Sequence, residues 1–308
     1  MSKKRIIILG GPTAAGKSDA GFHYAKKHEG EIISCDSMQV YQAVPVATNQ
    51  PPKDMLDVVP HHLISIMGVD QEFDVAQYYK LATAAIRSIH KRGNVPVIVG
   101  GSGLYIQILL DGIFQSGASD EAFRKQLRNR AEDEGVDALY DELKSKDPIA
   151  AKKIHPNDIK RVIRALEVFY HECQPISELQ QDREGLWNQY DIQYFALNLE
   201  RELLYSKINR RVDCMIAKGL IEEIDHLLKM NPGRTASGII GIKEIGGYLK
   251  GEYDLSQAAE LMKRNTRRLA KRQLTWFRKE KRLRWITIGK ADNVDSIIQR
   301  LNINFSKG

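Results

Sequence analysis

Cysteines, long apolar runs and targeting signals are scarce in this 308-residue chain. Cys35, Cys173 and Cys214 lie far apart without C-x-x-C spacing, which predicts reduced thiols and neither a disulfide framework nor a zinc site. The charged N-terminus leads into only four apolar residues, too few for a signal peptide, and no later run is long enough to span a membrane. We therefore expect a cytoplasmic monomer with no membrane contact and no obligate protein partner.

Positive charge is concentrated near the C-terminus. Residues 263–284 contain eleven Lys or Arg and one Glu, a net charge of +10, so the rest of the chain carries −3 of the total of +7. A solvated helix face is one explanation. However, Gln273, Trp276 and Phe277 lie among these cations, and a basic stripe with aromatic residues is also typical of a nucleic-acid surface with a stacking platform.

Short strand-like runs alternate with helical patterns, which predicts an α/β fold with a parallel sheet covered on both faces. One helix is expected between Asp74 and Lys91 and ended by Gly93, another through Leu203 to Met230, and a third from Leu255, with Asp254 and Gln257 as a capping-box candidate. The expected strands are Arg5–Leu9, Glu31–Ser34, Val95–Val99, Gln193–Leu197 and Trp285–Thr287.

The strand signals vanish in the middle of the chain. From Ser119 to about Gln181, apolar residues such as Leu139 and Leu166 lie among dense charges at helical spacing. We interpret residues 119–185 as an inserted all-helical module. Residues 1–118 and 186–308 would then form one discontinuous core domain.

The motif with the most specific chemistry follows the first expected strand. Gly11, Gly16, Lys17 and Ser18 match the pattern G-x-x-x-x-G-K-[ST], so the fold is expected to be P-loop NTPase-like. Backbone amides of such a loop bind phosphate oxygens, the lysine neutralises the outer phosphates, and the serine is placed to ligate Mg²⁺. The predicted diphosphate or triphosphate site comprises Gly11, Pro12, Thr13, Ala14, Ala15, Gly16, Lys17 and Ser18.

Two further segments lie at the expected carboxyl ends of strands, where α/β sheets bind ligands. Asp36 follows the second strand and is a candidate to accept a proton or to help position Mg²⁺, although it is also a candidate helix N-cap. The third strand ends in Gly100-Gly101-Ser102-Gly103, without the acidic residue that a hydrolytic motor would place there. These glycines allow close approach of a substrate or of another backbone, and they also suit a tight strand-to-helix turn; both interpretations can hold together. Ser102 supplies a hydroxyl.

Other polar residues remain open to two interpretations. Adjacent His61 and His62, in an expected loop, favour structural hydrogen bonds over a metal site. Arg161 and Arg164 share a helix face that suits phosphate or carboxylate partners. Arg211 adjoins the buried stripe of its helix and points either into the crevice or to a salt bridge.

Taken together, these segments resemble the tRNA dimethylallyltransferase family over nearly the full chain. The resemblance is carried by the phosphate loop and by the blocks Asp36–Tyr41, His61–Ile64, Gly100–Tyr105, Ile154–Asp158, Arg161, Arg164–Val168, Gly241–Glu244, Asn265–Arg267 and Ala270–Arg278.

The resemblance implies that dimethylallyl diphosphate donates its five-carbon group to the exocyclic N6 amine of the adenosine 3′ of the tRNA anticodon. N6-isopentenyladenosine and diphosphate would be the products. Asp36 would accept the amine proton, while Ser18 with Mg²⁺, Lys17 and Arg211 would stabilise the leaving diphosphate.

The same resemblance, together with the basic C-terminal helix, predicts the contacts with the anticodon stem-loop. The expected tRNA-binding residues are Asp36, Ser37, Met38, Gln39, Ser102, Arg124, Lys160, Arg161, Val162, Ile163, Arg164, Lys271 and Arg272. An unpaired loop base costs least to extrude, which suits this target.

Several positions depart from the family pattern. Ala47-Thr48-Asn49-Gln50-Pro51 replaces glycine-threonine-alanine-lysine-proline, removing one cation near the site, and Glu172-Cys173 replaces threonine-glycine. Single departures are Ser65 for aspartate, Ser102 for threonine, Lys160 for glutamine and Ile242 for tyrosine. Because Asp36, Lys17, Ser18 and Arg211 are intact, we expect the chemistry to be kept, whereas RNA affinity or the set of accepted tRNAs is open to change.

Two other functions are compatible with parts of the pattern. A nucleoside or small-molecule kinase would use the same loop to present a γ-phosphate. A non-catalytic RNA-binding protein would keep a relic nucleotide pocket. The basic C-terminal stretch favours an RNA acceptor over the first, and the intact Lys17, Ser18 and Asp36 argue against the second.

Overall fold

The computed structural model describes residues 3–114, 120–181 and 183–303. The chain divides into two compact units, one formed by Met1–Leu110 with Trp187–Gly308 and the other by Asp111–Leu186. We call them the core unit and the helical unit. The helical unit begins earlier than the expected boundary at residue 119, which itself lies outside the described residues.

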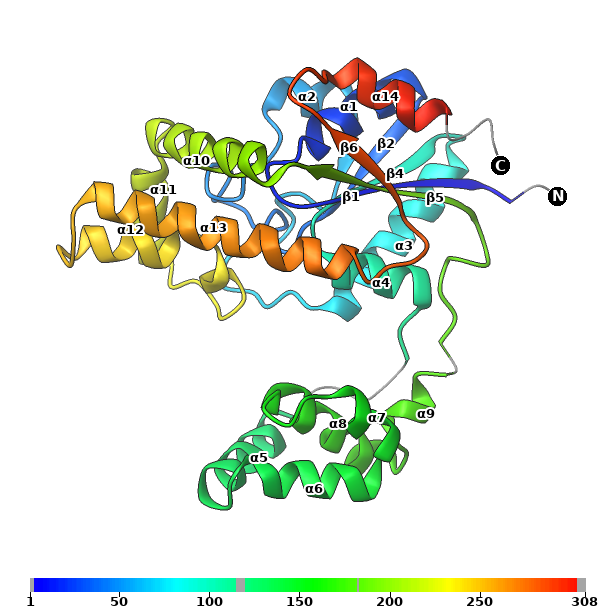
Figure 1. Ribbon diagram of the computed structural model, residues 1–308, viewed down its shortest axis with the longest axis vertical. Coiled ribbons are helices and arrows are strands. Elements are labelled where there is room, and N and C mark those ends of the chain that lie inside the picture. Colours follow the sequence, from blue (N-terminus) through cyan, green and yellow to red (C-terminus); the bar gives the residue numbers. More distant parts are fainter. Residues whose placement is uncertain (1–2, 115–119, 182, 304–308) are drawn as a thin grey trace. The chain divides into compact units, whose positions relative to one another are not determined.

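A six-stranded sheet forms the centre of the core unit, and all of its neighbouring strands are parallel, as the sequence predicts (Figure 1). The strand order is β3-β2-β4-β1-β5-β6. The strands are β1 (Arg5–Gly10), β2 (Gly30–Cys35), β3 (His61–His62), β4 (Val95–Gly100), β5 (Asp191–Leu199) and β6 (Arg284–Ile288).

The prediction that His61 and His62 lie in a loop is wrong, because these residues form the edge strand β3 beside Ile32 and Ile33 of β2. A two-residue strand has no alternating pattern that a sequence could show. The other five strands lie where they are expected, with ends that differ by up to two residues.

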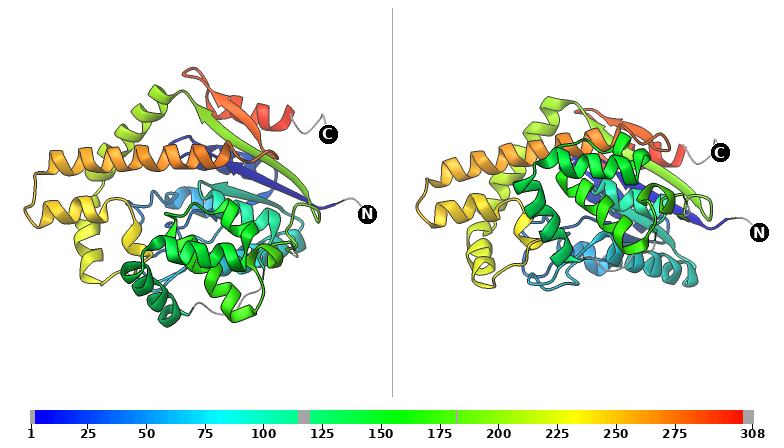
Figure 2. Two further views of the ribbon diagram at one scale, coloured as in Figure 1. Left: turned by 60° about the horizontal axis from the view of Figure 1, so that its bottom comes forward. Right: turned by 90° about the horizontal axis from the view of Figure 1, so that it is seen from below.

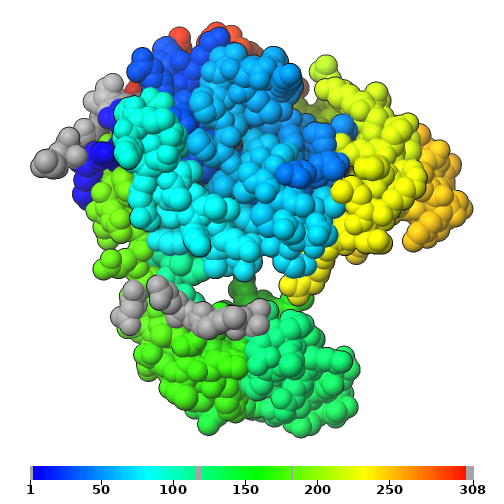
Figure 3. All heavy atoms as spheres, turned by 180° about the vertical axis from the view of Figure 1, so that it is seen from behind, coloured from blue at the N-terminus to red at the C-terminus, as the bar shows by residue number. Residues whose placement is uncertain are grey.

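Helices cover both faces of the sheet, which explains why β1 and β4 are nearly continuous apolar runs. In Figure 1, α1 (Lys17–Lys27) and α14 (Val294–Ile303) lie on one side of the sheet, and α3 (Val75–Lys91) and α4 (Gly103–Asp111) on the other. The short helix α2 (Lys53–Val58) lies in the connection between β2 and β3. Seen from behind in Figure 3, the segment between β2 and β4, coloured blue to cyan, covers much of one face of this unit.

Helix α3 shows how local sequence determines an element. Its N-cap Asp74 accepts a hydrogen bond from the Gln77 amide, and the Gln77 side chain accepts one from the Asp74 amide, which completes a capping box. The helix ends at Lys91, and Gly93 follows with φ +86°, so the expected end is confirmed.

Four helices pack together beside the carboxyl edge of the sheet, with α12 and α13 side by side (Figure 2). They are α10 (Arg201–Ala217), α11 (Leu220–Lys229), α12 (Ile242–Leu249) and α13 (Leu255–Phe277), with a short 3-10 helix at Ala236–Gly238. The expected single helix through Leu203 to Met230 is wrong, because Gly219 at φ +88° separates α10 from α11. Asp254 caps α13 by accepting from the Gln257 amide.

The helical unit contains only helices among its described residues. They are α5 (Glu121–Asp133), α6 (Val136–Lys146), α7 (Pro148–Lys153), α8 (Ile159–Glu172) and α9 (Ile176–Leu179). Leu127, Leu139, Leu143 and Leu166 form its core. Cys173 ends α8 at φ +53°, a left-handed conformation that glycine adopts at least cost.

All three cysteines are free; Cys35 is buried, and Cys173 and Cys214 are exposed. In the described part of the chain, no helix combines the length and apolarity needed to cross a membrane.

Candidate active site

The phosphate loop connects β1 to α1 at the carboxyl edge of the sheet. Ala14 at φ +64° and Gly16 at φ +86° turn the backbone so that successive amides face one side, an arrangement that binds anions. The amides of Thr13 and Ala15 already donate to Gln273 and Pro12. Those of Ala14, Gly16, Lys17 and Ser18 have no protein acceptor in the described chain and remain available for phosphate oxygens.

Two half-buried, partly desolvated cations face this loop. Lys17 Nζ donates to the Pro12 carbonyl at 2.6 Å, and Arg211 Nη1 donates to Thr13 Oγ1 at 3.0 Å. Desolvation, and then the neighbouring Arg211, lower the pKa of Lys17 to about 7. Burial likewise lowers the pKa of Arg211, against the opposing influence of Asp19 and Asp36.

Neither cation forms a salt bridge with any carboxylate in the described residues. The two interpretations left open for Arg211 are thereby resolved: its guanidinium lies in the crevice. A site with two desolvated like charges and free amides is suited to a multiply charged anion.

Two cavities adjoin at this edge of the sheet. The phosphate cavity, about 120 Å³, is lined by the loop, Lys17 and Arg211. The second, which we call the apolar cavity, measures about 260 Å³. Most of its apolar lining comes from helices α10 and α13 and the segment before α12: Val212, Met215, Ile239, Ile240, Met262 and Leu269. Met38 and Ala47 add to it. The residues common to both linings are Thr13, Asp36, Thr48, Asn49, Arg211 and Gln273.

Asp36 lies where the two cavities meet. It follows the last residue of β2, and its Oδ1 accepts from the Met38 amide at 2.9 Å. The alternative role as a helix N-cap is excluded, because residues 37–40 form a turn and no helix begins there. The second oxygen, Oδ2, has no donor among the described residues and is available to accept a proton.

The glycines after β4 allow the protein's own elements to approach closely. A Cβ on Gly100 would lie 2.0 Å from the Cys35 carbonyl oxygen, and one on Gly101 would lie 2.2 Å from Gln273 Nε2. A Cβ on Gly103 would come within 2.1 Å of the Trp276 ring. The expected close approach is thus present: the backbone of β2 approaches Gly100, and side chains of α13 approach Gly101 and Gly103. Ser102 lines the apolar cavity.

Thr48 and Asn49 reach the cavities through a loop fixed from both sides. Gln39 Nε2 donates to the Asn49 carbonyl at 3.0 Å. On the other side, Glu223 of α11 accepts from the amides of Val46 at 2.9 Å and Ala47 at 2.7 Å. Burial raises the pKa of Glu223. No sequence pattern indicates the role of this carboxylate, because its partners lie about 180 positions earlier in the chain.

Two of the departures from the family pattern contact each other. Ser65 Oγ donates to Gln50 Oε1 at 2.9 Å, and Gln50 Nε2 donates to the carbonyl of Tyr41 at 2.9 Å. Where the pattern has lysine and aspartate, this chain therefore has a neutral, hydrogen-bonded pair. Ile242, another departure, is buried at the start of α12.

The histidines make structural hydrogen bonds, as expected. The Nδ1 of His61 lies 2.7 Å from the Val59 carbonyl oxygen, and the Nε2 of His62 lies 2.7 Å from Glu31 Oε2.

A stripe of exposed cations follows α13. The members of this cationic stripe are Arg264, Arg268, Lys271, Arg272, Arg278 and Lys279, which have no protein partner among the described residues. Arg272 also lines the apolar cavity. The expected stacking role of Phe277 is wrong, because its ring is buried against Gly10. Trp276 packs on Gly103.

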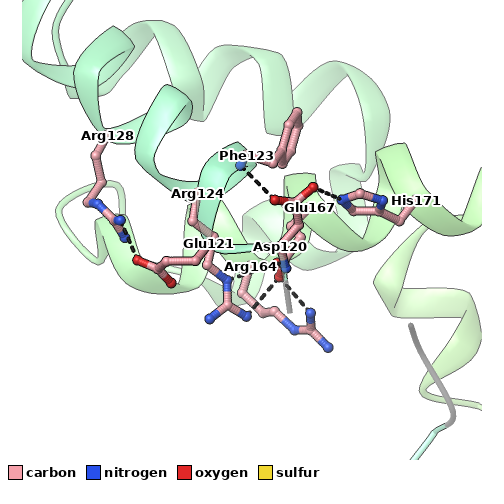
Figure 4. Close-up of polar contacts among 8 residues, drawn as sticks. All are labelled: Asp120, Glu121, Phe123, Arg124, Arg128, Arg164, Glu167 and His171. Carbon is pink, nitrogen blue, oxygen red and sulfur yellow. Dashed lines mark hydrogen bonds and ion pairs between the residues drawn. The ribbon is translucent and has the colours of Figure 1, made fainter. Parts of the chain in front are cut away.

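In the helical unit, the buried carboxylate of Glu167 holds two of the expected tRNA-binding residues (Figure 4). Arg124 makes a two-pronged contact with it at 2.9 Å, and Arg164 donates to it at 2.6 Å. The side chains of Val162 and Ile163 lie in the core, so they support the helix, whereas Lys160 and Arg161 are exposed. Of the two partners expected for Arg164, phosphate or a carboxylate, the structure shows the carboxylate of Glu167. Arg161 pairs with Asp158.

The residues of the phosphate cavity suit Mg²⁺ shared with a diphosphate. The Ser18 hydroxyl has no protein partner among the described residues, and the carboxylates of Asp19 and Asp36 line the same cavity. No group of three or more His, Cys, Asp or Glu that would bind a metal ion occurs in the described chain. Ligand oxygens and water would therefore complete the shell, as is usual for this ion.

A family model described as IPP transferase matches residues 39–280. The chain is 46% identical to the tRNA dimethylallyltransferase of Carboxydothermus hydrogenoformans, over 98% of this chain and 97% of that protein. It is 43% identical to the tRNA dimethylallyltransferase of Geobacter sulfurreducens, over 96% and 95% of the two chains.

Solved structures give the same result. The crystal structure of the full-length tRNA isopentenylpyrophosphate transferase of Bacillus halodurans is similar with a TM-score of 0.72 and 38% identity, over 99% of this chain and 97% of that one. A eukaryotic dimethylallyltransferase acting on tRNA has a TM-score of 0.84 and 29% identity, over 98% of this chain and 78% of that one.

Proposed function

The chain belongs to the IPP transferase family, and on that premise we propose that it is a tRNA dimethylallyltransferase. It transfers the dimethylallyl group of dimethylallyl diphosphate to the N6 amine of the adenosine 3′ of the anticodon. The products are N6-isopentenyladenosine and diphosphate. We expect it to act as a monomer in the cytoplasm.

The observation that supports this reaction best is the position of Asp36 between a cationic cavity and an apolar one. A donor with a diphosphate head and a hydrocarbon tail needs both environments side by side. The carbon that joins head to tail, where the new bond forms, would then lie next to Asp36. This arrangement favours an allylic diphosphate over a nucleoside triphosphate as the ligand of the loop.

The adenine amine is a weak nucleophile, so its proton must leave as the carbon–nitrogen bond forms. Asp36 Oδ2 has no donor among the described residues, whereas Oδ1 is held by the Met38 amide, which fixes the orientation of the carboxylate. Asp36 would therefore accept the proton from N6.

Departure of diphosphate places additional negative charge on the bridging oxygen. Lys17, Arg211 and the amides of Ala14 to Ser18 that have no protein acceptor are already oriented around the cavity, so little reorganisation is needed when that charge develops. Ser18 would hold Mg²⁺ against the diphosphate. When bound, the ion would neutralise part of the leaving-group charge.

The tRNA would be bound mainly through its phosphates. The cationic stripe on α13 offers exposed, unpaired charges, and Arg272 connects that surface to the apolar cavity. Ser37, Met38 and Ser102 line the same cavity and would contact the extruded base. In the helical unit, Arg124, Arg164 and the exposed Lys160 and Arg161 supply further positive charge.

The direct test incubates the full-length protein with dimethylallyl diphosphate, Mg²⁺ and unmodified tRNA, followed by mass spectrometry of the digested nucleosides. The expected result is an adenosine that carries one added five-carbon group, adjacent to the anticodon. Phosphorylation of a nucleoside or small molecule, with no prenylated product, would contradict the proposal.

A substitution tests the role of Asp36. Because an amide does not accept the N6 proton, Asp36→Asn should lower kcat by about 10² or more and leave the dissociation constant for dimethylallyl diphosphate nearly unchanged. Asp54→Asn, on the exposed helix α2, serves as the control and should retain full activity. Equal turnover in Asp36→Asn would exclude the role of general base.

A further inference from the structure

Gln273 is the polar side chain of α13 that enters both cavities. Its Oε1 accepts a hydrogen bond from the Thr13 amide at 2.8 Å, across 260 residues of sequence. It is half-buried, in contrast to its neighbours Lys271 and Arg272, which are exposed. Gln273 therefore joins the phosphate loop to the helix that carries the cationic stripe.

Thr13 receives a second contact, from helix α10. Arg211 Nη1 of α10 donates to Thr13 Oγ1 at 3.0 Å. The backbone and the side chain of this one loop residue are thus held by two different helices. Thr13 in turn determines where the guanidinium of Arg211 lies in the phosphate cavity.

The shape of the site around Gln273 supports a specific function for this residue. Gly101 has no Cβ, and one placed there would lie 2.2 Å from Gln273 Nε2, so a larger residue at position 101 would displace the amide group. Because the Thr13 N–H requires an acceptor, Oε1 must face the loop, and this fixes the orientation of the whole amide group. Nε2 then has no protein acceptor in the described chain.

We propose that Gln273 is a positioning residue of the transfer reaction, which holds Thr13 and thereby Arg211 in the geometry that binds the diphosphate. The expected effect of Gln273 on turnover rests on the proposed function. The expected effect of Gln273 on diphosphate binding is the same whatever molecule accepts the transferred group. Without the Oε1 acceptor, the Thr13 amide is released, and the loop and Arg211 lose their common anchor.

The experiment compares Gln273→Met, which keeps the length of the side chain without an acceptor, with Gln273→Glu, which keeps an acceptor oxygen. Gln257→Met, on an exposed position of the same helix, is the matched control. Three quantities are measured with the full-length protein: the dissociation constant for inorganic diphosphate with Mg²⁺, kcat and KM for tRNA, and hydrogen exchange of a peptide that includes Thr13.

For Gln273→Met we expect about tenfold weaker diphosphate binding and about tenfold lower kcat, the effect of losing one buried hydrogen bond, with KM for tRNA unchanged. Exchange at the loop should accelerate. In Gln273→Glu, exchange should stay slow because the acceptor is kept. Gln257→Met should match the wild type in all three measurements.

Three results would overturn the inference: unchanged diphosphate binding in a folded Gln273→Met protein, equally fast loop exchange in Gln273→Glu, or a change confined to KM for tRNA. If Gln273→Met does not fold, Gln273→Asn, which is too short to reach Thr13, replaces it. A wild type that binds diphosphate but prenylates no tRNA would refute the proposed function and leave the binding comparison valid.

Discussion

Charged side chains near the two ends of strand β2 differ in whether they have partners of opposite charge. Near its start, Glu31 has only 3% of its side chain exposed and receives a full set of donors. Arg92 donates twice, at 2.8 and 2.6 Å, and Asn94 donates at 2.8 Å, while His62 Nε2 lies 2.7 Å away. Hydrogen bonds from Arg92 are the main reason that the pKa of Glu31 falls to about 2.

Beyond the other end of β2, beside Asp36, lie the half-buried charges of Lys17 and Arg211. Among the described residues, their side-chain hydrogen-bond partners are a carbonyl and a hydroxyl. Burial lowers the pKa of both groups instead of favouring their charged forms. A buried charge with hydrogen-bond donors around it is compatible with a stable fold, whereas a desolvated charge without an ion-pair partner costs stability. Under the proposed function, an anion bound at this end of the sheet would offset that cost.

The largest expected effects come from removing one charge at each end. Lys17→Met should weaken diphosphate binding by about 10² or more, because a desolvated cation is lost. The same substitution should raise Tm of the ligand-free protein by about 2–6 °C, since an unfavourable buried charge disappears. Isothermal titration calorimetry and thermal unfolding measure the two quantities.

Glu31→Gln is the counterpart and should lower the free energy of unfolding by about 2 kcal/mol, because it removes a buried charge and one acceptor oxygen from donors that converge on it. Diphosphate binding should be unchanged. The folded-state pKa of Glu31 lies below its ordinary value of 4.5, so its contribution is full above about pH 4.5 and is lost as the pH falls toward about 2. If the free energy of unfolding fell equally in the wild type and in Glu31→Gln between about pH 4.5 and 2, Glu31 would not be the stabilising carboxylate.

Exposed cations without partners form a third case, represented by the stripe on α13. Substituting Lys271→Gln and Arg272→Gln together should weaken tRNA binding by roughly tenfold and reduce the slope of log affinity against log salt by about 1 to 2. Thermal stability should not change, because these charges are solvated. Lys263→Gln removes a cation of the same helix that is paired with Asp213, and it should leave the salt slope nearly unaltered.

The pH dependence of diphosphate binding tests whether Lys17 titrates in the site. A bound diphosphate favours the protonated form of Lys17, so its pKa rises above about 7 on binding and a proton is taken up. Affinity for diphosphate should then fall by up to about tenfold per unit as the pH rises above 7. Lys17→Arg keeps its charge throughout this range, and its affinity should show a flatter profile. Identical profiles for the two proteins would exclude Lys17 as the titrating group.

The smallest effect is expected at the neutral pair of Gln50 and Ser65. Gln50→Lys or Ser65→Asp alone should lower the free energy of unfolding by about 1 kcal/mol, because each introduces a charge without its partner. The double variant should return to within about 0.5 kcal/mol of the wild type if the two positions form one pair. Additive losses, measured by urea unfolding, would show that the two positions are independent.

Local patterns were sufficient to predict the parts of the site that lie within one segment. The phosphate loop follows from its glycine spacing, and the position of Asp36 follows from the rule that strand ends face the ligand crevice. The strands β1, β2 and β4 follow from their apolar runs. In each of these cases, the neighbours along the chain carry the information.

The rest of the site depends on contacts between distant segments. Gln273 contacts Thr13 across 260 positions, and Glu223 holds the loop at Val46 across 177 positions. No periodicity or motif records such a pair. The buried position of Phe277 was missed for a related reason: a helix pattern does not show which neighbouring element, here Gly10, a residue will face.

We propose that Lys17 and Arg211, which have no salt bridge among the described residues, hold the diphosphate of the donor next to Asp36. A crystal structure of Asp36→Asn with dimethylallyl diphosphate and Mg²⁺ tests it most directly, because slow turnover preserves the donor. We predict the diphosphate against the amides of Ala14 to Ser18, within contact of Lys17 and Arg211, and the dimethylallyl group in the apolar cavity. A diphosphate bound elsewhere, with Lys17 and Arg211 still facing only Pro12 and Thr13, would contradict the account.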